Sequence, residues 1–424
     1  MNIAIIGAGY VGLVTAAGLA KLGHTVRVGE ANPDRVETLR AGGVPIFEVG
    51  LPELLAEGTA EGRLTFHNSN VEAIDGAKFI FLCLPTPEGR DGRADLSYID
   101  LVVDELATEV TDGTIFMVKS TVPPGTVAGL AKRLANRGSQ GRIVSHPEFL
   151  REGRAVPDFL DPDRIVVGAY DRADAEAVAA LYESVDTELV VTDPTSAEMI
   201  KYASNSYLAA RLTFVNTLAS LCEAVGADVM DVLEGMGLDH RIGPHFLKPG
   251  PGYGGSCFPK DTIALIGVAE DAGYDFGLLR AVIAADEDQR RRLADKVRQA
   301  AGGGLRGRRV AMWGVAFKAG TDDVRESPAL RVAQLLQDDG AEVVAYDPEA
   351  ISDAVTMAPT AVEATRGADV LLVATEWPEF ADVDMAEVAS IMKGYRVVDA
   401  RNLLDPSAVR KAGLDYWGLG RPGA

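Results

Sequence analysis

The chain has 424 residues, of which 47% are hydrophobic and 24% charged, and its formal net charge is −21. This length exceeds one ordinary hydrophobic core, so we expect a globular protein of two or three domains. The acidic balance excludes the basic surface that non-specific nucleic-acid binding needs. A local group of Lys and Arg side chains could still bind an anionic small molecule.

Cysteine usage and the N-terminus bear on the compartment. Three cysteines are too few for a disulfide framework and favour a reducing environment. No Cys or His pair has zinc-ligand spacing, so we expect no metal. The opening MNIAIIGAGYVG has no basic segment before its apolar run, and no run reaches the ~20 residues of a membrane span. We therefore expect a cytoplasmic protein with no membrane or nucleic-acid partner.

The first part of the chain alternates short apolar strands with helical periods, which is typical of a parallel α/β sheet. The expected strands are residues 2–6, 25–30, 79–84, 115–118, 143–145, 165–167 and 189–191. A different pattern begins at Thr195, because Thr195-Ser-Ala-Glu198 has the form of a capping box. No Gly or Pro follows up to Val225, which predicts one helix of roughly 30 residues, about 45 Å long.

More helix is expected over 286–301, and the glycines of AAGGGLRGRR (300–309) predict a hinge. After it, RVAMWGVAF, AEVVAYDP, ADVLLVAT and YRVVDARN predict the strands of a second α/β unit. The sequence thus predicts an α/β protein with two Rossmann-like domains, each with a parallel sheet, joined by a central helical domain with one long helix. The expected boundaries are 1–193, 194–301 and 302–424.

A glycine pattern directly after the first strand indicates a dinucleotide site. Gly7, Gly9 and Gly12 allow a tight turn and close backbone approach, and the following helix can bind a pyrophosphate at its N-terminus. About 20 residues on, the second strand ends at Glu30, where a carboxylate binds ribose hydroxyls and repels a 2′-phosphate. This favours NAD over NADP, although Arg35 lies close by. The alternative is a glycine turn without a ligand. The second α/β unit lacks this pattern and is expected to bind something else.

Two further features could carry chemistry. Cys257 lies in the glycine-rich stretch GPGYGGSCFPKD, outside any apolar run, where a nearby cation and loop amides favour the reactive thiolate. It is either a nucleophile or a bystander, whereas Cys83 and Cys222 lie in apolar runs and are expected in the core. Lys201 and Asn205 share one helical face and could hold a developing oxyanion beside a nicotinamide. Alternatively they are a solvated lysine and a surface asparagine.

Eight segments in order carry a resemblance that covers nearly the whole chain. They are GAGYVGL, CLPTP, KSTVPPGT, HPEFLREG, DPDRIVVG, KYASNSYLA, HRIGPHFLKPGPGYGGSCFPKD and FKAGTDDVRESPAL. With them the chain resembles the UDP-glucose/GDP-mannose dehydrogenase family, and most closely its UDP-glucose branch. The resemblance implies oxidation of UDP-glucose at C6, from alcohol to aldehyde to acid, with two NAD as cofactor.

The same resemblance implies roles for individual residues. Attack by Cys257 on the aldehyde would give a thiohemiacetal, and oxidation would give a thioester that water hydrolyses. Lys201 and Asn205 would stabilise the oxygen at C6. Asp261 and Thr121 would hold the water, with Glu148 as general base or water partner. No catalytic metal is implied.

The resemblance also implies binding residues and a dimer. Cofactor contacts are expected from Gly7, Gly9, Tyr10, Val11, Gly12, Glu30, Arg35, Thr86, Thr121, Glu152 and Arg325. Substrate contacts are expected from Glu148, Phe149, Leu150, Arg151, Glu152, Lys201, Asn205, Arg241, Phe246, Lys248, Tyr253, Gly254, Cys257, Phe317, Lys318 and Arg401. Arg241 would reach the sugar from the partner subunit, so a homodimer built on the long helix is expected. Glu30 departs from the Asp of many relatives, which puts cofactor affinity in question.

Three other functions remain open at this point. The substrate could be another nucleotide sugar, GDP-mannose or UDP-N-acetylmannosamine, because sugar choice rests on loop contacts. A two-electron hydroxyacid dehydrogenase would also use Lys and Asn beside a Rossmann domain, but it has no use for Cys257. A non-catalytic NAD sensor would tolerate loss of that thiol.

Overall fold

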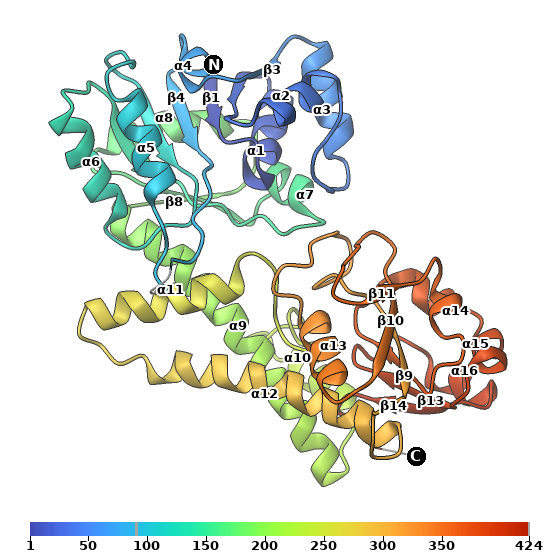
Figure 1. The fold of residues 1–424 in the computed structure, drawn as a ribbon. Helices are drawn as coiled ribbons and strands as arrows, with labels where there is room; N and C mark the ends of the chain where they lie inside the picture. The colour runs from blue at the N-terminus through green and yellow to red at the C-terminus, as the bar shows by residue number, and fades with distance from the viewer. Residues whose placement is uncertain (90–91, 423–424) are drawn as a thin grey trace. The chain divides into compact units, whose positions relative to one another are not determined.

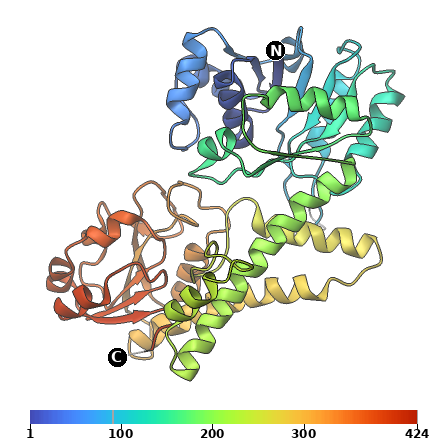
Figure 2. The ribbon, with the colours of Figure 1, turned by 180° about the vertical axis from the view of Figure 1, so that it is seen from behind.

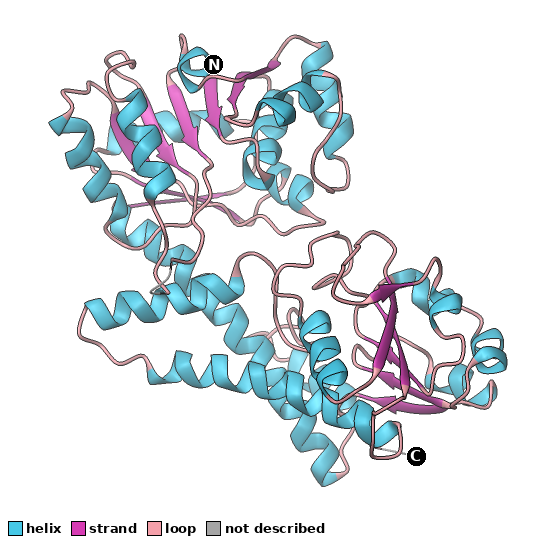
Figure 3. Cartoon of the chain, viewed as in Figure 1, coloured by secondary structure: helices cyan, strands magenta, loops and turns pink. Residues whose placement is uncertain are grey.

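The computed structural model describes residues 1–89 and 92–422, which form two compact units. The first unit comprises Met1–Ser204 and Ile263–Tyr274, and the second comprises Asn205–Thr262 and Asp275–Ala424. Figure 1 follows the chain by colour, from the blue N-terminal strands to the red C-terminal ones. Each unit contains a sheet flanked by helices, as Figure 3 shows with strands in magenta and helices in cyan. This confirms the predicted fold class.

The first unit contains an eight-stranded sheet in the order β3-β2-β1-β4-β5-β6-β7-β8. Its strands are β1 Asn2–Ile6, β2 Thr25–Gly29, β3 Leu64–His67, β4 Phe79–Leu82, β5 Ile115–Val118, β6 Arg142–Ser145, β7 Arg164–Gly168 and β8 Glu188–Thr192. Neighbouring strands are parallel except β6 and β7, which meet antiparallel at Ser145 and Gly168. The strand pattern did not indicate this reversal, because the connection carries only the six-residue helix α7 (Ala155–Leu160).

Helices cover both faces of this sheet, as expected for a doubly wound fold. They are α1 Tyr10–Lys21, α2 Pro33–Arg40, α3 Leu51–Ala60, α4 Asn70–Ile74, α5 Ser97–Leu106, α6 Thr126–Asn136, α7, α8 Arg172–Ala179 and the short η1 Ala180–Tyr182. In β1, Ile3 and Ile5 pack on the face with α1 and α8, whereas Ala4 and Ile6 pack on the face with α5 and α6. Figures 1 and 2 show these opposite faces.

The helical region contains the long helix α9, Pro194–Val225, with α10 Val229–Gly237, α11 Phe258–Asp271 and α12 Gly277–Ala300. The start of α9 differs from the predicted capping box. Asp193 accepts the Ser196 backbone N–H at 2.9 Å. The Glu198 carboxylate instead accepts the backbone N–H groups of Gly125 and Val127, so a tertiary partner replaces the local one.

By length and composition, α9 is the one helix in the described chain that could cross a membrane. A third of its most apolar window (33%) is buried, and its buried residues include Lys201 and Asn205. It is therefore a partly buried helix of the fold and not a signal sequence. The sequence analysis predicted no apolar run as long as a membrane span, and it did not identify α9 as a helix that meets this test by length and composition.

The second unit contains a six-stranded parallel sheet in the order β11-β10-β9-β12-β13-β14. Its strands are β9 Arg309–Trp313, β10 Glu342–Tyr346, β11 Thr356–Met357, β12 Val370–Val373, β13 Arg396–Asp399 and β14 Asp415–Gly418. One face packs on α12 and α13 (Pro328–Asp338). The other packs on α14 Ala361–Ala364, η2 Pro378–Asp382, α15 Met385–Ile391 and α16 Pro406–Lys411.

Candidate active site

The loop after β1 has the geometry that the glycine pattern predicted. Gly7 has φ +102°, and a Cβ there would lie 2.4 Å from the Cys83 carbonyl oxygen. A Cβ on Gly12 would lie 1.9 Å from the Gly7 oxygen. By contrast, a Cβ on Gly9 would meet nothing within 4 Å. Backbone packing therefore requires Gly7 and Gly12, whereas Gly9 leaves open space where a ligand can approach the backbone.

The end of β2 places Glu30 against this loop. Its carboxylate accepts the Ala8 N–H at 3.0 Å and the Asn32 N–H at 2.8 Å, which leaves acceptor sites for ribose hydroxyls. Arg35 donates to the Ala8 carbonyl at 3.1 Å and so braces the loop. No side chain caps the N-terminus of α1 at Gly9. These features fit the pyrophosphate and ribose of a dinucleotide.

Tyr10 and Val11 begin α1. The Tyr10 hydroxyl donates to Glu48, whose carboxylate also accepts the N–H groups of Gly153 and Ala155. The loop after β1 is thus tied to the segment that contains Glu152. Thr86 donates to the Thr121 carbonyl at 3.0 Å, and both threonines are buried. Sequence motifs far apart along the chain meet here, because the carboxyl ends of β1, β4 and β5 share one edge of the sheet.

Glu148 and Lys201 form a buried ion pair inside the first unit. The Lys201 Nζ lies 2.8 Å from the Glu148 Oε1, and each side chain is 4% exposed. Burial raises the pKa of Glu148, but the charge and hydrogen bond of Lys201 outweigh it, so this pKa lies below its usual value. Leu150 N–H donates to the other carboxylate oxygen at 2.6 Å. Lys201 is therefore not a solvated lysine, which was the alternative interpretation of the sequence.

Phe149 and Arg151, which follow Glu148 in the chain, have different surroundings. The Phe149 ring lies 3.7 Å from the Arg164 guanidinium carbon and 5.5 Å from the Lys201 Nζ. Arg151 forms a two-pronged ion pair with Asp158, at 2.8 and 2.5 Å. Arg151 therefore faces an acid within its own segment, and the structure does not bring it to Glu148.

Sequence reasoning missed a second buried cation, Lys119, which follows β5. Its Nζ lies 3.3 Å from His146 Nε2, which also pairs with the Tyr182 hydroxyl at 2.8 Å. His146 Nδ1 faces the Val166 carbonyl at 2.8 Å, so it carries the proton. Burial lowers the pKa of Lys119 to about 8 and that of His146 well below its usual value. Both lie in quoted motifs, but an apolar run gives no signal of a buried Lys.

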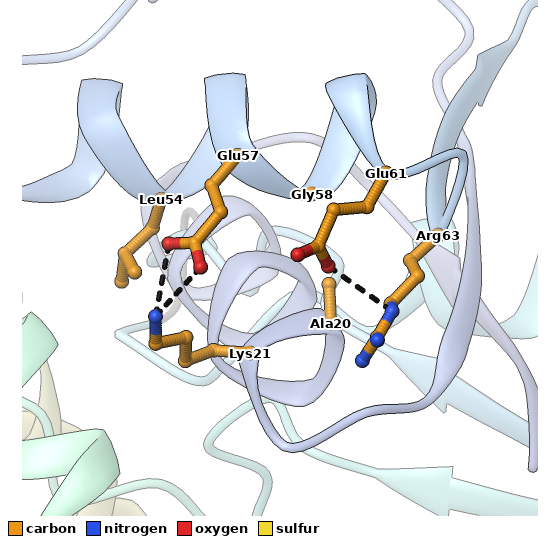
Figure 4. Close-up of a pocket in the computed structure, with 7 residues that line it drawn as sticks. All are labelled: Ala20, Lys21, Leu54, Glu57, Gly58, Glu61 and Arg63. Atoms are coloured by element: carbon orange, nitrogen blue, oxygen red, sulfur yellow. Dashed lines mark hydrogen bonds and ion pairs between the residues drawn. The ribbon is translucent and has the colours of Figure 1, made fainter.

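Lys119, His146, Phe149 and Leu150 also line a cavity of about 40 Å³, together with Arg164 and Tyr182. A second pocket, shown in Figure 4, lies between α1 and α3 and shares no residue with the predicted site. Its charged side chains neutralise one another as Lys21–Glu57 and Arg63–Glu61 ion pairs. It offers no unbalanced charge to a ligand.

The second unit holds the other predicted catalytic residues. The Asn205 side-chain amide donates to Asp261 Oδ2 at 2.6 Å, and Lys260 contacts Asp261 Oδ1 at 2.6 Å. Asp261 is fully buried. Asn205 lies one turn after Lys201 on α9 and is 6% exposed, so it is not a surface asparagine.

Cys257 immediately precedes the 14-residue helix α11 and is partly exposed. Its Sγ lies 3.5 Å from the Ser256 hydroxyl, a neighbour that the sequence reasoning did not single out. A helix N-terminus favours the thiolate. Cys83 and Cys222 are buried, as predicted, and burial raises the pKa of Cys83 to about 12.

The glycine loop before Cys257 packs closely against the β9–α13 connection. Gly255 N–H donates to the Arg325 carbonyl at 3.1 Å. A Cβ on Gly254 would lie 2.3 Å from the Glu326 oxygen, and one on Gly255 would lie 2.9 Å from the Phe317 ring. These contacts explain the glycines: larger residues would not fit between the two segments.

The predicted cationic substrate contacts have different surroundings. Arg401 donates to the carbonyls of Ala374 and Phe317, at 2.9 and 3.2 Å. Lys318 lies 5.5 Å from the Phe317 ring. Arg325 pairs with Asp323. Phe246 and Lys248 come shortly before Gly250 in the chain, and Phe246 has the unusual φ of +56°.

Arg241 is 78% exposed and pairs with Asp239, so within one chain it contacts none of the other predicted site residues that the structure describes. Among residues 1–89 and 92–422, no group of Cys, His, Asp or Glu is placed to hold a metal ion.

Three segments of the chain match domains of the UDP-glucose/GDP-mannose dehydrogenase family. Residues 1–186 match its NAD binding domain, 195–288 its central domain and 311–406 its UDP binding domain. The prediction of an NAD cofactor agrees with the first match.

Individual relatives match over the full length. The chain is 43% identical to a UDP-glucose 6-dehydrogenase of Rhizobium meliloti, with 100% of both chains covered. It is 39% identical to a UDP-glucose 6-dehydrogenase, TuaD, of Bacillus subtilis, covering 99% of this chain and 93% of TuaD. Among solved structures, a UDP-glucose dehydrogenase from Pyrobaculum islandicum superposes with a TM-score of 0.91 at 39% identity, covering 99% and 97% of the two chains. A UDP-D-ManNAc dehydrogenase from Pyrococcus horikoshii gives a TM-score of 0.89 at 29% identity, covering 99% of each.

Proposed function

Because the chain belongs to the UDP-glucose/GDP-mannose dehydrogenase family, we propose that it oxidises UDP-glucose at C6 to UDP-glucuronate. Each turnover consumes one water and two NAD⁺ and yields two NADH. The observation that carries this proposal is the full-length identity of 43% to a UDP-glucose 6-dehydrogenase. The buried Glu148–Lys201 and Asn205–Asp261 pairs support it, because a surface role would not bury them.

NAD, when bound, supplies the hydride acceptor for both oxidations. The open space at Gly9, the uncapped N-terminus of α1 and the carboxylate of Glu30 are the features that would hold it. Tyr10, Val11, Arg35, Thr86, Thr121, Glu152 and Arg325 remain proposed contacts.

In the first oxidation, we assign Lys201 and Asn205 to the oxygen at C6. Two donors four residues apart on α9 can both face one oxygen atom and stabilise the negative charge that develops there. Asp261 accepts from the Asn205 amide and so orients it. Glu148 holds the Lys201 ammonium in place and, being ionised, can accept a proton.

In the second oxidation, the Cys257 thiolate adds to the aldehyde carbon, and the new oxyanion takes a proton to give a thiohemiacetal. Loss of hydride from that sp³ carbon, with loss of the hydroxyl proton, leaves a thioester. Water then attacks the thioester carbonyl, with Glu148 as base and Thr121 as water partner. Breaking the C–S bond releases the acid and restores the thiolate.

The chain offers a surface for the proposed homodimer. Tyr207, Phe214 and Leu221 recur at seven-residue spacing on α9 and are 66%, 57% and 57% exposed. Such a stripe is typical of a helix that packs against a partner. We propose that two copies pair through it and that Arg241 acts in the partner's site. We also propose domain limits of 1–193, 194–301 and 302–424, a cytoplasmic location and the remaining substrate contacts.

The test is the NADH stoichiometry with UDP-glucose, with GDP-mannose and UDP-N-acetylmannosamine as competing substrates. We expect two NADH per UDP-glucose and much slower turnover of the other sugars. One NADH per sugar would indicate a two-electron dehydrogenase, and preference for another sugar would reassign the substrate. Cys257→Ser should form no acid while still binding NAD; undiminished acid production would remove the thiol from the mechanism.

A further inference from the structure

Helix α12 presents a row of buried polar side chains that the proposed mechanism leaves unused. Asp286, Gln289 and Arg290 lie three and four residues apart, so they share one helical face. Asp286 and Gln289 are 2% and 3% exposed, and the Arg290 side chain is 14% exposed. Burial of two charges and an amide is unfavourable unless each finds a partner. Their partners are in the glycine loop before Cys257, which comprises residues 250–257.

Asp286 and Arg290 hold Tyr253 by both of its backbone polar groups. Asp286 Oδ1 accepts the Tyr253 N–H at 2.9 Å, and Arg290 Nη2 donates to the Tyr253 carbonyl at 2.9 Å. The two side chains are joined to each other at 2.5 Å. We term these three contacts among Asp286, Arg290 and Tyr253 the Tyr253 clamp. The clamp restricts the peptide groups on either side of Tyr253 to one orientation.

A second pair of contacts fixes Gly250 in the same way. The Gln289 amide donates to the Gly250 carbonyl at 2.8 Å, and the Asn216 side-chain oxygen accepts the Gly250 N–H at 2.8 Å. Between the two fixed residues, Gly252 has φ +135°, and a Cβ there would lie 2.9 Å from Asp286 Oδ1. The loop therefore follows the α12 side chains closely, in a conformation open only to glycine.

We propose that Asp286 and Arg290 are positioning residues that hold the loop so that the Cys257 thiolate reaches the aldehyde carbon. Tyr253 lies four residues before Cys257, with Gly254 and Gly255 between, and glycines transmit no restraint of their own. Side chains from α12 hold the loop at Tyr253, and the Arg325 carbonyl holds it at Gly255. The inference rests on the proposed function.

The clamp predicts a defect confined to one half of the reaction. In the proposed mechanism the first oxidation uses Lys201 and Asn205 and makes no bond to Cys257, so a displaced loop should slow it less than the second oxidation, even though Tyr253 and Gly254 are proposed substrate contacts. The second needs a C–S bond, and misplacement by about 1 Å can cost a hundredfold in rate. A loosened clamp should therefore release the aldehyde before it is captured.

The test uses Asp286→Asn in the full-length enzyme, with Asp288→Asn as the matched control. Asp288 lies on the same helix and pairs with Arg291, but both side chains are more than half exposed, at 54% and 58%. The measurements are NADH formed per UDP-glucose consumed, aldehyde trapped with hydroxylamine, and the rate of Cys257 alkylation by iodoacetamide. Cys83 and Cys222 are buried and should react slowly.

For Asp286→Asn we expect the ratio to fall from two toward one, with trapped aldehyde and at least a threefold change in alkylation rate. Asp288→Asn should match the parent enzyme in all three. Arg290→Lys keeps a charge beside Asp286 but loses the planar fork, and should give an intermediate ratio. This milder variant decides the question if Asp286→Asn does not fold.

Two results would overturn the inference. One is a ratio of two with parental alkylation in both clamp variants. The other is an equal loss of both oxidations that parallels lost thermal stability, which indicates a structural role alone. A ratio other than two in the parent enzyme would count against the proposed function itself, so the two failures are distinguishable.

Discussion

The six strands of the second sheet follow the same order as the first six strands of the first sheet, and both sheets have the same turn after their first strand. Gly7 follows β1 with φ +102°, and Gly314 follows β9 with φ +92°. Each donates its N–H to the last residue of the adjacent strand, Gly7 to Gly29 at 2.8 Å and Gly314 to Tyr346 at 2.7 Å. A Cβ on Gly314 would lie 2.2 Å from Thr375, as one on Gly7 would collide with Cys83. Up to this point the two units solve the same packing problem.

They differ at the acidic residue that follows the second strand. Glu30 accepts two N–H groups. Asp347 accepts five donors, from Val315, Ala316, Glu349, Ala350 and the Trp377 ring. Because a carboxylate has about four acceptor sites, Asp347 has no capacity left for a ribose. Residues 315–327 also separate Gly314 from α13, whereas α1 begins at Tyr10. The same fold can therefore bind a dinucleotide in one unit and not in the other.

The largest predicted effect is that of Asp347→Ala. It leaves several buried donors without an acceptor, so we expect the free energy of unfolding to fall by about 3 to 5 kcal/mol. The counterpart Glu30→Ala should cost about 1 kcal/mol but weaken NAD binding roughly tenfold. Urea unfolding and NAD titration of both variants test the comparison. Similar stability losses would mean that the two acids have the same structural role.

A second contrast concerns the strands β5 and β13, which occupy equivalent places in the two sheets. Asp399 ends β13 and accepts donors from Arg401, Leu404 and Tyr416. Lys119 follows β5 and contacts His146 at 3.3 Å. Burial lowers its pKa from 10.5 to about 8. At neutral pH Lys119 is charged in both the folded and the unfolded chain. Its charge is less favourable in the buried site than in water, so it lowers the free energy of unfolding.

Lys119→Met should therefore raise the free energy of unfolding by about 2 kcal/mol at pH 7. The gain should shrink as the pH rises from 8 toward 10.5, where the unfolded chain also loses the proton. Lys119 lowers the pKa of Glu148, so the acid limb of kcat/KM should move to higher pH in the variant. Denaturant unfolding at several pH values and a pH–rate profile check both effects. A less stable variant would contradict the assignment of Lys119 as a destabilising charge.

The smallest effect on folding is expected for Gly9→Ala. Its φ of −79° suits alanine and the new methyl group meets nothing within 4 Å, so stability should change by less than about 0.5 kcal/mol. NAD affinity should fall roughly tenfold, because that methyl occupies the space proposed for the pyrophosphate. Thermal unfolding and NAD titration separate the two outcomes. Unchanged affinity would show that the cofactor does not approach Gly9.

Local pattern was sufficient where burial is strict. Strands β1 and β5 were predicted to the residue, because an apolar run bounded by turn residues has few other interpretations. Strands β3, β11 and β14 were missed, since they are short or carry mixed side chains. The helix α9 was predicted within one residue, but its cap was assigned to the wrong side chain.

For the site as well, the sequence indicated some residues and missed others. Cys257 was singled out by its glycine-rich surroundings, Lys201 and Asn205 by their helical spacing, and Glu148 by the resemblance; the structure pairs Lys201 with Glu148 and Asn205 with Asp261. The support behind them was not found. Lys119 follows an apolar strand, and Asp286 and Arg290 of the Tyr253 clamp lie on a helix with many other charged residues. The sequence alone therefore does not distinguish these positions from their neighbours.

The sequence by itself determined the two α/β units, the long helix, the dinucleotide loop and the family, because each depends on spacing between residues near one another in the chain. Only the tertiary structure decided which charges are buried and which backbone groups they hold. Such contacts join residues that are far apart in the chain: Asp286 and Tyr253 are 33 positions apart, and Glu148 and Lys201 are 53 positions apart. Periodicity carries no information at that range, because the partners are chosen by how the elements pack.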